Sequence, residues 1–152
     1  MDILWEELTS GLPDARQLVH VLIRLIAASL LGALVGLQRE KAHKPAGLRT
    51  HILVSLGTAV FVLACSGVGM SQEGISRVIQ GIATGIGFVG AGSILKLNEE
   101  RNIQGLTTAA GIWMVAAIGV AVGLGSLGVA LLSTLLTLIV LALAGPLEDK
   151  PE

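Results

Sequence analysis

Apolar residues dominate five long stretches of the chain, and charged residues gather in the short segments between them. Each stretch is about 18 to 20 residues long, enough for a helix to cross a hydrocarbon layer of roughly 30 Å. The connections are too short to hold a separate folded domain. The pattern predicts five transmembrane helices, at residues 18–37, 50–68, 78–95, 106–124 and 127–144.

The expected fold class is therefore all-α, a polytopic membrane bundle of five helices. We divide the chain into an N-terminal interfacial segment at 1–17, a transmembrane domain at 18–145 and a short cytoplasmic tail at 146–152. In the first segment, apolar residues recur at helical spacing, which predicts a short amphipathic helix lying in the membrane interface. These residues are Ile3, Leu4, Trp5, Leu8 and Leu12.

The distribution of Lys and Arg predicts the orientation of the five spans. One side of the membrane receives 2 cations, Arg16 and Arg77, and the other receives 7. Because cytoplasmic loops carry the excess of Lys and Arg, we expect the N-terminus outside and the C-terminus in the cytoplasm. The seven cytoplasmic cations are Arg39, Lys41, Lys44, Arg49, Lys96, Arg101 and Lys150.

Composition agrees with a membrane protein and excludes several other classes. The 152 residues are 53% apolar and 14% charged, with a mean hydropathy of +0.80, so too little polar surface is available for a water-soluble globule. A net charge of −1 gives no reason to expect nucleic-acid binding, and the single cysteine supplies neither a disulfide framework nor a zinc site. All 11 acidic residues lie outside the predicted spans, which argues against a membrane-embedded divalent-cation site, so we expect no metal and no cofactor.

The chain contains 20 glycines, and many of them lie in the apolar stretches, which are therefore rich in residues without a side chain. Three G-x-x-x-G pairs lie within spans, at Gly32 and Gly36, Gly81 and Gly85, and Gly119 and Gly123. Such pairs favour close packing between helices. An alternative for the third span is a partly irregular or re-entrant segment that lines a cavity, because its glycines are so dense. The glycines behind this alternative are Gly81, Gly85, Gly87, Gly90 and Gly92.

Arg24 is the charged residue expected within a span, about seven residues from its outer end. Its long side chain could snorkel to the headgroups, or it could face the bundle and bind carbonyl oxygens, an anionic group or a carboxylate of a partner. His20, Arg24, Ala28, Gly32 and Gly36 follow one another at four-residue spacing, so the cationic residues and the first glycine pair share a slowly winding face.

The basic segment 38–51 between the first two spans is explained first as the anchor that sets topology. It also places a cation, a hydroxyl and an imidazole in succession at Arg49, Thr50 and His51, where they could hold a lipid phosphate or an acidic partner surface. The remaining candidate positions are polar residues within or beside the spans. They are Arg39, Glu40, Gln80, Thr107 and Thr108.

We expect no enzymatic activity. The sequence contains no G-x-S-x-G, no H-E-x-x-H and no intramembrane aspartate pair. A pairing of Ser93 with His51 in a membrane hydrolase is a weak alternative, because nothing beyond their shared cytoplasmic half supports it.

Four segments together resemble the MgtC/SapB family of bacterial inner-membrane proteins. They are GLQRE at 36–40, KPAGLRTH at 44–51, GIGFVGAG at 85–92 and GLTTAAGIW at 105–113. The resemblance implies a five-span domain with a cytoplasmic C-terminus, a link to growth under Mg²⁺ limitation and to survival of intracellular pathogens, and, for some members, inhibition of the F-type ATP synthase. Longer members carry a cytoplasmic ACT-like domain, whereas this sequence ends eight residues after Ala144, so we expect a short form.

Two hypotheses on function follow. In the first, a small non-enzymatic membrane protein acts through helix–helix contacts on another membrane complex, with the F-type ATP synthase suggested by the resemblance. In the second, an oligomer transports an ion, such as Mg²⁺. In either case we expect contact with membrane lipids and a homo-oligomer, most simply a dimer through one glycine face.

Overall fold

The computed structural model describes residues 3–4, 14–96 and 103–148. The interfacial helix expected in the first segment falls largely outside these residues. Five long helices follow one another, α2 (Ala15–Lys41), α3 (Leu48–Gly67), α4 (Gln72–Gly92), α5 (Leu106–Gly123) and α6 (Leu127–Glu148). They agree with the five predicted stretches, so the all-α fold class is confirmed. Two short strands, β1 (Leu95–Lys96) and β2 (Ile103–Gln104), pair antiparallel between α4 and α5.

The helix boundaries have local causes. The Asp14 carboxylate accepts a hydrogen bond of 2.7 Å from the Gln17 amide and caps the start of α2, three residues earlier than the hydropathy pattern predicts. Ser71 caps α4 in the same way, through the Gly74 amide. Gly105 precedes α5 with φ of 98°, a left-handed conformation that favours glycine.

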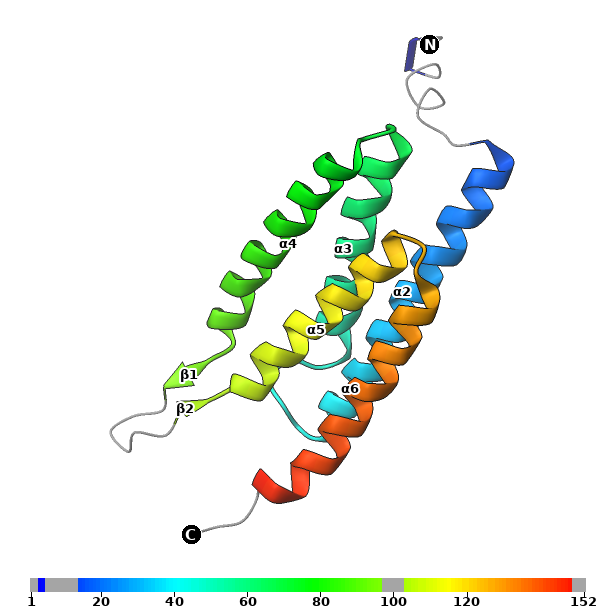
Figure 1. The fold of residues 1–152 in the computed structure, drawn as a ribbon. Coiled ribbons are helices and arrows are strands. Elements are labelled where there is room, and N and C mark those ends of the chain that lie inside the picture. The colour runs from blue at the N-terminus through cyan, green and yellow to red at the C-terminus, as the bar shows by residue number, and fades with distance from the viewer. Residues whose placement is uncertain (1–2, 5–13, 97–102, 149–152) are drawn as a thin grey trace.

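The helices run up and down, so their connections gather at two opposite ends (Figure 1). The α2–α3 loop, the β1–β2 pair and the end of α6 lie at one end, called here the basic end because Lys41, Lys44 and Arg49 are there. The α3–α4 and α5–α6 turns lie at the other. Three helices, α2, α3 and α5, are long and apolar enough to cross a membrane, and the segment Leu127–Leu143 within α6 is a shorter apolar helix.

The core lies where α2, α3, α5 and α6 meet. Its fully or almost fully buried residues are small or branched aliphatics such as Ala28, Ala59, Ile118, Val122 and Ala130. A second cluster nearer the basic end consists of Val35, Val115 and Leu141. The α4 helix stands apart at the edge of the bundle, where it packs mainly on α5 and less on α3 (Figure 1).

The α4 helix is continuous from Gln72 to Gly92. The alternative of an irregular or re-entrant third span is therefore wrong. The glycines in this helix do not interrupt its hydrogen bonds, because a helical backbone needs no side chain to close its ladder.

Candidate functional site

The candidate site is a buried polar cluster at the basic end, between α2, α3 and α5. Its members are Arg39 from α2, His51 and Ser55 from α3, and Thr108 from α5, each at most 3% exposed. Because these side chains would cost free energy if left without hydrogen bonds in an apolar interior, their arrangement constrains how the three helices pack.

A direct hydrogen bond joins α2 to α5 in this cluster. The Arg39 Nη2 atom donates to the Thr108 hydroxyl at 2.9 Å, and the two residues are 3% and 1% exposed. Hydrogen bonds that involve an ionised group are roughly twice as strong as neutral ones. The pair therefore holds the last turn of α2 against the first turn of α5.

His51 lies on the α3 side of the cluster and is fully buried. Its Nδ1 atom is 2.8 Å from the Gly47 carbonyl oxygen, so Nδ1 carries the proton and donates. In the neutral ring, Nε2 is then an acceptor, and no described residue forms a hydrogen bond with it. The buried Ser55 hydroxyl, one turn further along α3, likewise forms no hydrogen bond with a described residue.

The loop that leads into His51 is fixed by Glu40. Its Oε2 atom accepts a hydrogen bond of 2.8 Å from the Leu48 amide, which satisfies a free N–H group at the start of α3. A Cβ atom at Gly47 would lie 2.9 Å from the same carboxylate oxygen. Glu40 thus acts as a cap for α3, and a glycine at position 47 leaves room for it.

The predicted trio of Arg49, Thr50 and His51 does not form one cluster. Arg49 is exposed at the basic end and Thr50 is half-buried, whereas His51 points into the bundle. The interpretation of these three residues as a single phosphate or acidic-surface site is therefore wrong. Successive helical positions differ by about 100°, so one residue can face solvent while another, two positions on, faces the core.

Arg24 lies at the opposite end, and its side chain faces the bundle. Its Nη1 atom donates to the Gly123 carbonyl oxygen at 2.9 Å, at the C-terminal end of α5. A cation there is stabilised by the partial negative charge of the helix end. The carbonyl-binding alternative for Arg24 is the one observed. The guanidinium also occupies the space beside Gly125, which has φ of 84°.

Two of the three G-x-x-x-G pairs pack on α3. A Cβ atom at Gly32 would lie 2.7 Å from the His51 carbonyl oxygen, and one at Gly36 would lie 2.7 Å from Leu48 Cα, so α2 closes on one side of α3. From α5, Gly119 meets Ser55 and Thr58, and Gly123 meets Val62. The α3 helix is therefore held between two glycine grooves.

The third pair is different. Cβ atoms added at Gly81, Gly85, Gly87 or Gly92 would meet nothing within 4 Å, and only Gly90 in this group is buried, opposite Ala109. Gly81 and Gly85 line an open apolar groove of about 400 Å³ between α3 and α4, together with residues that include Thr58, Phe61 and Ile82. This groove is called the α3–α4 groove below.

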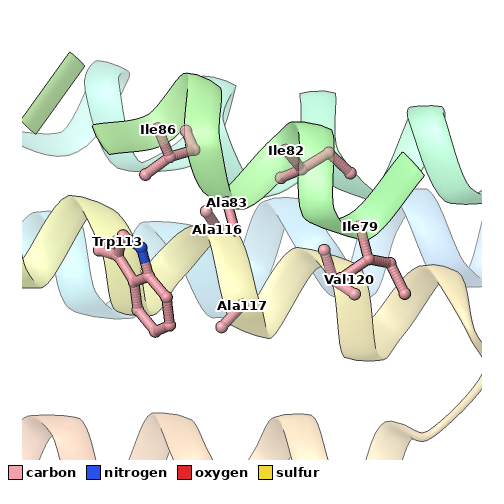
Figure 2. A pocket seen from close by; sticks show the side chains of 8 residues that line it. All are labelled: Ile79, Ile82, Ala83, Ile86, Trp113, Ala116, Ala117 and Val120. Carbon is pink, nitrogen blue, oxygen red and sulfur yellow. The ribbon is translucent and has the colours of Figure 1, made fainter. Parts of the chain in front are cut away.

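On its other side, α4 meets α5 across a second, smaller apolar pocket of about 130 Å³. Figure 2 shows α4 and α5 side by side, with the lining residues along both helices. The lining is entirely apolar apart from the Trp113 indole nitrogen. It consists of Ile79, Ile82, Ala83, Ile86, Trp113, Ala116, Ala117 and Val120.

Several candidates have other places in the fold. Gln80 is exposed on α4, and Thr107 is half-buried beside Thr108. Sequence reasoning missed Gln38, whose Nε2 atom donates to the Leu141 carbonyl oxygen at 3.4 Å and links α2 to α6. Its position next to Arg39, at the end of an apolar stretch, was the available signal. In the part of the chain described here, no three His, Cys, Asp or Glu residues are grouped as a metal site would need.

A bundle of apolar helices, packed through glycine grooves and carrying a buried polar cluster, defines the class of helical membrane proteins. The MgtC family model matches residues 25–150, and the chain belongs to the MgtC family. It is 41% identical to protein SrpB of Synechococcus elongatus, over 78% of this chain and 71% of that one.

Two other relatives are longer than this chain. It is 42% identical to a protein of Escherichia coli K12 named "Putative magnesium transporter YhiD", over 79% of this chain and 58% of the relative. It is 45% identical to protein MgtC of Salmonella typhimurium, over 77% of this chain and 49% of the relative. The chain thus spans about half the length of that relative. No solved structure matches it.

Proposed function

We propose that the protein is a multi-pass bacterial inner-membrane protein that crosses the membrane five times, with its C-terminus in the cytoplasm. The two-ended arrangement of loops supports this topology, because Lys41, Lys44 and Arg49 lie at the same end as the end of α6. The α5–α6 turn lies at the other end, where Arg24 binds the last turn of α5.

Its function in this proposal is non-enzymatic: it receives a transmembrane helix of another membrane complex in the α3–α4 groove and so takes part in Mg²⁺ homeostasis. The single observation that carries the proposal is that Gly81 and Gly85 face open space, whereas the other two G-x-x-x-G pairs are filled by α3. Small residues allow two backbones to approach closely, and lipid provides no other strong driving force for association. The F-type ATP synthase is the first partner to test.

The test compares Gly85→Leu with Gly128→Leu, because a Cβ atom at Gly128 would also meet nothing within 4 Å, but Gly128 lies on α6, which contributes no residue to the groove. Photo-crosslinking from Phe61 in native membranes should join the wild type to ATP synthase subunits. Gly85→Leu should reduce this yield at least tenfold and impair growth at low Mg²⁺, and Gly128→Leu should do neither. Equal yields from wild type and Gly85→Leu would contradict the proposal.

A transporter is the second candidate, and the buried polar cluster is the observation that favours it. His51 Nε2 and Ser55 Oγ are buried polar atoms with no partner among the described residues, as pathway-lining groups often are. One relative also carries a transporter name. Purified protein in proteoliposomes should then carry Mg²⁺ or another ion under an imposed potential, and Ser55→Ala should slow the flux. If no flux is observed while the protein still crosslinks to a partner, the transporter function would be contradicted and the partner-binding function would be supported.

A further inference from the structure

Six residues on α4 form a straight line along the outward face of the helix. They follow a spacing of four, three, four, three and four residues, which places them on one side of a helix, and all six are exposed. They are Glu73, Arg77, Gln80, Thr84, Gly87 and Ala91, and this line is called the α4 seam below.

The chemistry of the seam does not suit a surface that faces lipid. Elsewhere the exposed surfaces of the helices carry large aliphatic side chains, such as Leu34, Leu53 and Leu132. The seam instead carries an acid, a base, an amide, a hydroxyl and two residues with little or no side chain. In agreement, α4 is not one of the three helices apolar enough to be recognised as a span.

Gln80 makes this contrast sharpest. It is the ninth residue of a 21-residue helix, roughly 12 Å from the helix start at 1.5 Å per residue. The side-chain amide has two donor hydrogens and one acceptor oxygen, yet it forms no hydrogen bond with another described residue. The neighbouring Thr84 hydroxyl donates to the Gln80 backbone carbonyl, not to its amide. A membrane-embedded amide gains stability when it finds a polar partner.

We propose that the α4 seam is the interface between two copies of this chain. The seam is complementary to itself: two Gln80 amides related by a two-fold axis can each donate to and accept from the other. Glu73 and Arg77 already pair within one helix, and the same charges can pair between two copies at the membrane surface. Gly87 and Ala91 allow the C-terminal halves of the two α4 helices to approach closely.

The spacing also fixes the geometry of the pair. Copies inserted in the same orientation are related by an axis along the membrane normal, so their α4 helices run parallel. A repeat of 3.5 residues produces a left-handed crossing of about 20°. Gly81 and Gly85 lie on the neighbouring face of α4, beside Phe61 of α3, so the dimer leaves the α3–α4 groove open. The inference is therefore independent of the function proposed above.

Cysteine crosslinking of the purified protein in liposomes tests the seam. In a Cys65→Ser background, Thr84→Cys, Gly87→Cys and Ala91→Cys should each give a disulfide-linked dimer upon oxidation. Val89→Cys is the matched control, because Val89 is 43% exposed on the same helix but lies off the seam. Equal crosslinking at Val89 and at the seam, or none at the seam, would overturn the proposal.

A second measurement does not depend on cysteines. Gln80→Leu should weaken self-association, measured by energy transfer between labelled copies across a range of protein-to-lipid ratios, by roughly threefold to thirtyfold. Gln80→Asn should retain much of the association because it keeps the amide, and Val89→Leu should leave it unchanged. Helical circular dichroism will verify that each variant is folded. A monomeric wild type, or full association of Gln80→Leu, would overturn the inference.

Discussion

Glycines in this protein differ in what their missing side chains allow. Gly119 lies where a Cβ atom would overlap the Ser55 carbonyl and the Thr58 hydroxyl, whereas a Cβ atom at Gly81 would meet nothing within 4 Å. Both belong to G-x-x-x-G pairs, so the local sequence does not distinguish them. The difference lies in whether a second helix passes in front of them.

Gly119→Ala should lower the free energy of unfolding by about 1–3 kcal/mol, because backbone atoms of α3 must move to admit the new methyl group. Gly81→Ala should leave it unchanged or raise it by up to about 1 kcal/mol, since alanine favours the helix. Unfolding in mixed micelles, followed by circular dichroism, measures both. Wild-type stability of Gly119→Ala would show that α5 does not pack on α3 at this position.

The Thr108 hydroxyl provides a second comparison. Thr108→Val keeps the volume but removes the acceptor for Arg39, so we expect a loss of about 1–3 kcal/mol in the free energy of unfolding. Thr134 is a matched control, because it is also buried but donates only to Ala130 on its own helix. A Thr134→Val loss as large as that of Thr108→Val would argue against a specific role of the Arg39 contact.

At the ends of helices, charge and backbone geometry act together. Arg24 of α2 binds the last turn of α5, and Glu40 of α2 caps the first turn of α3. Two side chains of one helix thus fix the ends of two others. This explains why α2 contributes to stability beyond its apolar contacts.

Arg24→Leu should destabilise the protein by about 0.5–2 kcal/mol, because the C-terminal end of α5 loses its cation. Hydrogen exchange should accelerate at Leu124 and Gly125, next to the lost contact, and Arg24→Lys should restore part of the protection. Arg16→Leu, at an exposed position near the start of α2, is the control. If Arg24→Leu and Arg16→Leu behave alike, the Arg24 side chain is instead turned toward the headgroups.

For the molecule as a whole, the arrangement of the loops leads to a topology that can be measured. A reporter fused after Lys150 should read as cytoplasmic, and one inserted at Gly69, in the α3–α4 turn, should read as external. If both reporters read as cytoplasmic, or both as external, the five-span topology would be contradicted. Reducing the excess of cations from seven against two to five against two, by Lys41→Glu and Lys44→Glu together, should lower the fraction of correctly oriented chains.

The sequence by itself determined the helices and their order. A chain in lipid must satisfy its backbone hydrogen bonds within each segment, so long apolar stretches become helices for local reasons, and the five predicted stretches agree with α2 to α6. The G-x-x-x-G pairs also predicted that glycine grooves exist. The choice between alternatives for Arg24, and between a continuous and an irregular α4, was not.

Only the tertiary structure decided which groups meet. Arg39 and Thr108 are 69 residues apart, and nothing in the local pattern near either residue indicates the other. His51 was expected beside Arg49 and instead enters the core, because the rotation of α3 is set by the glycine grooves of α2 and α5 on its two sides. Packing partners depend on contacts distant in sequence, and these also leave Gly81, Gly85 and the α4 seam uncovered.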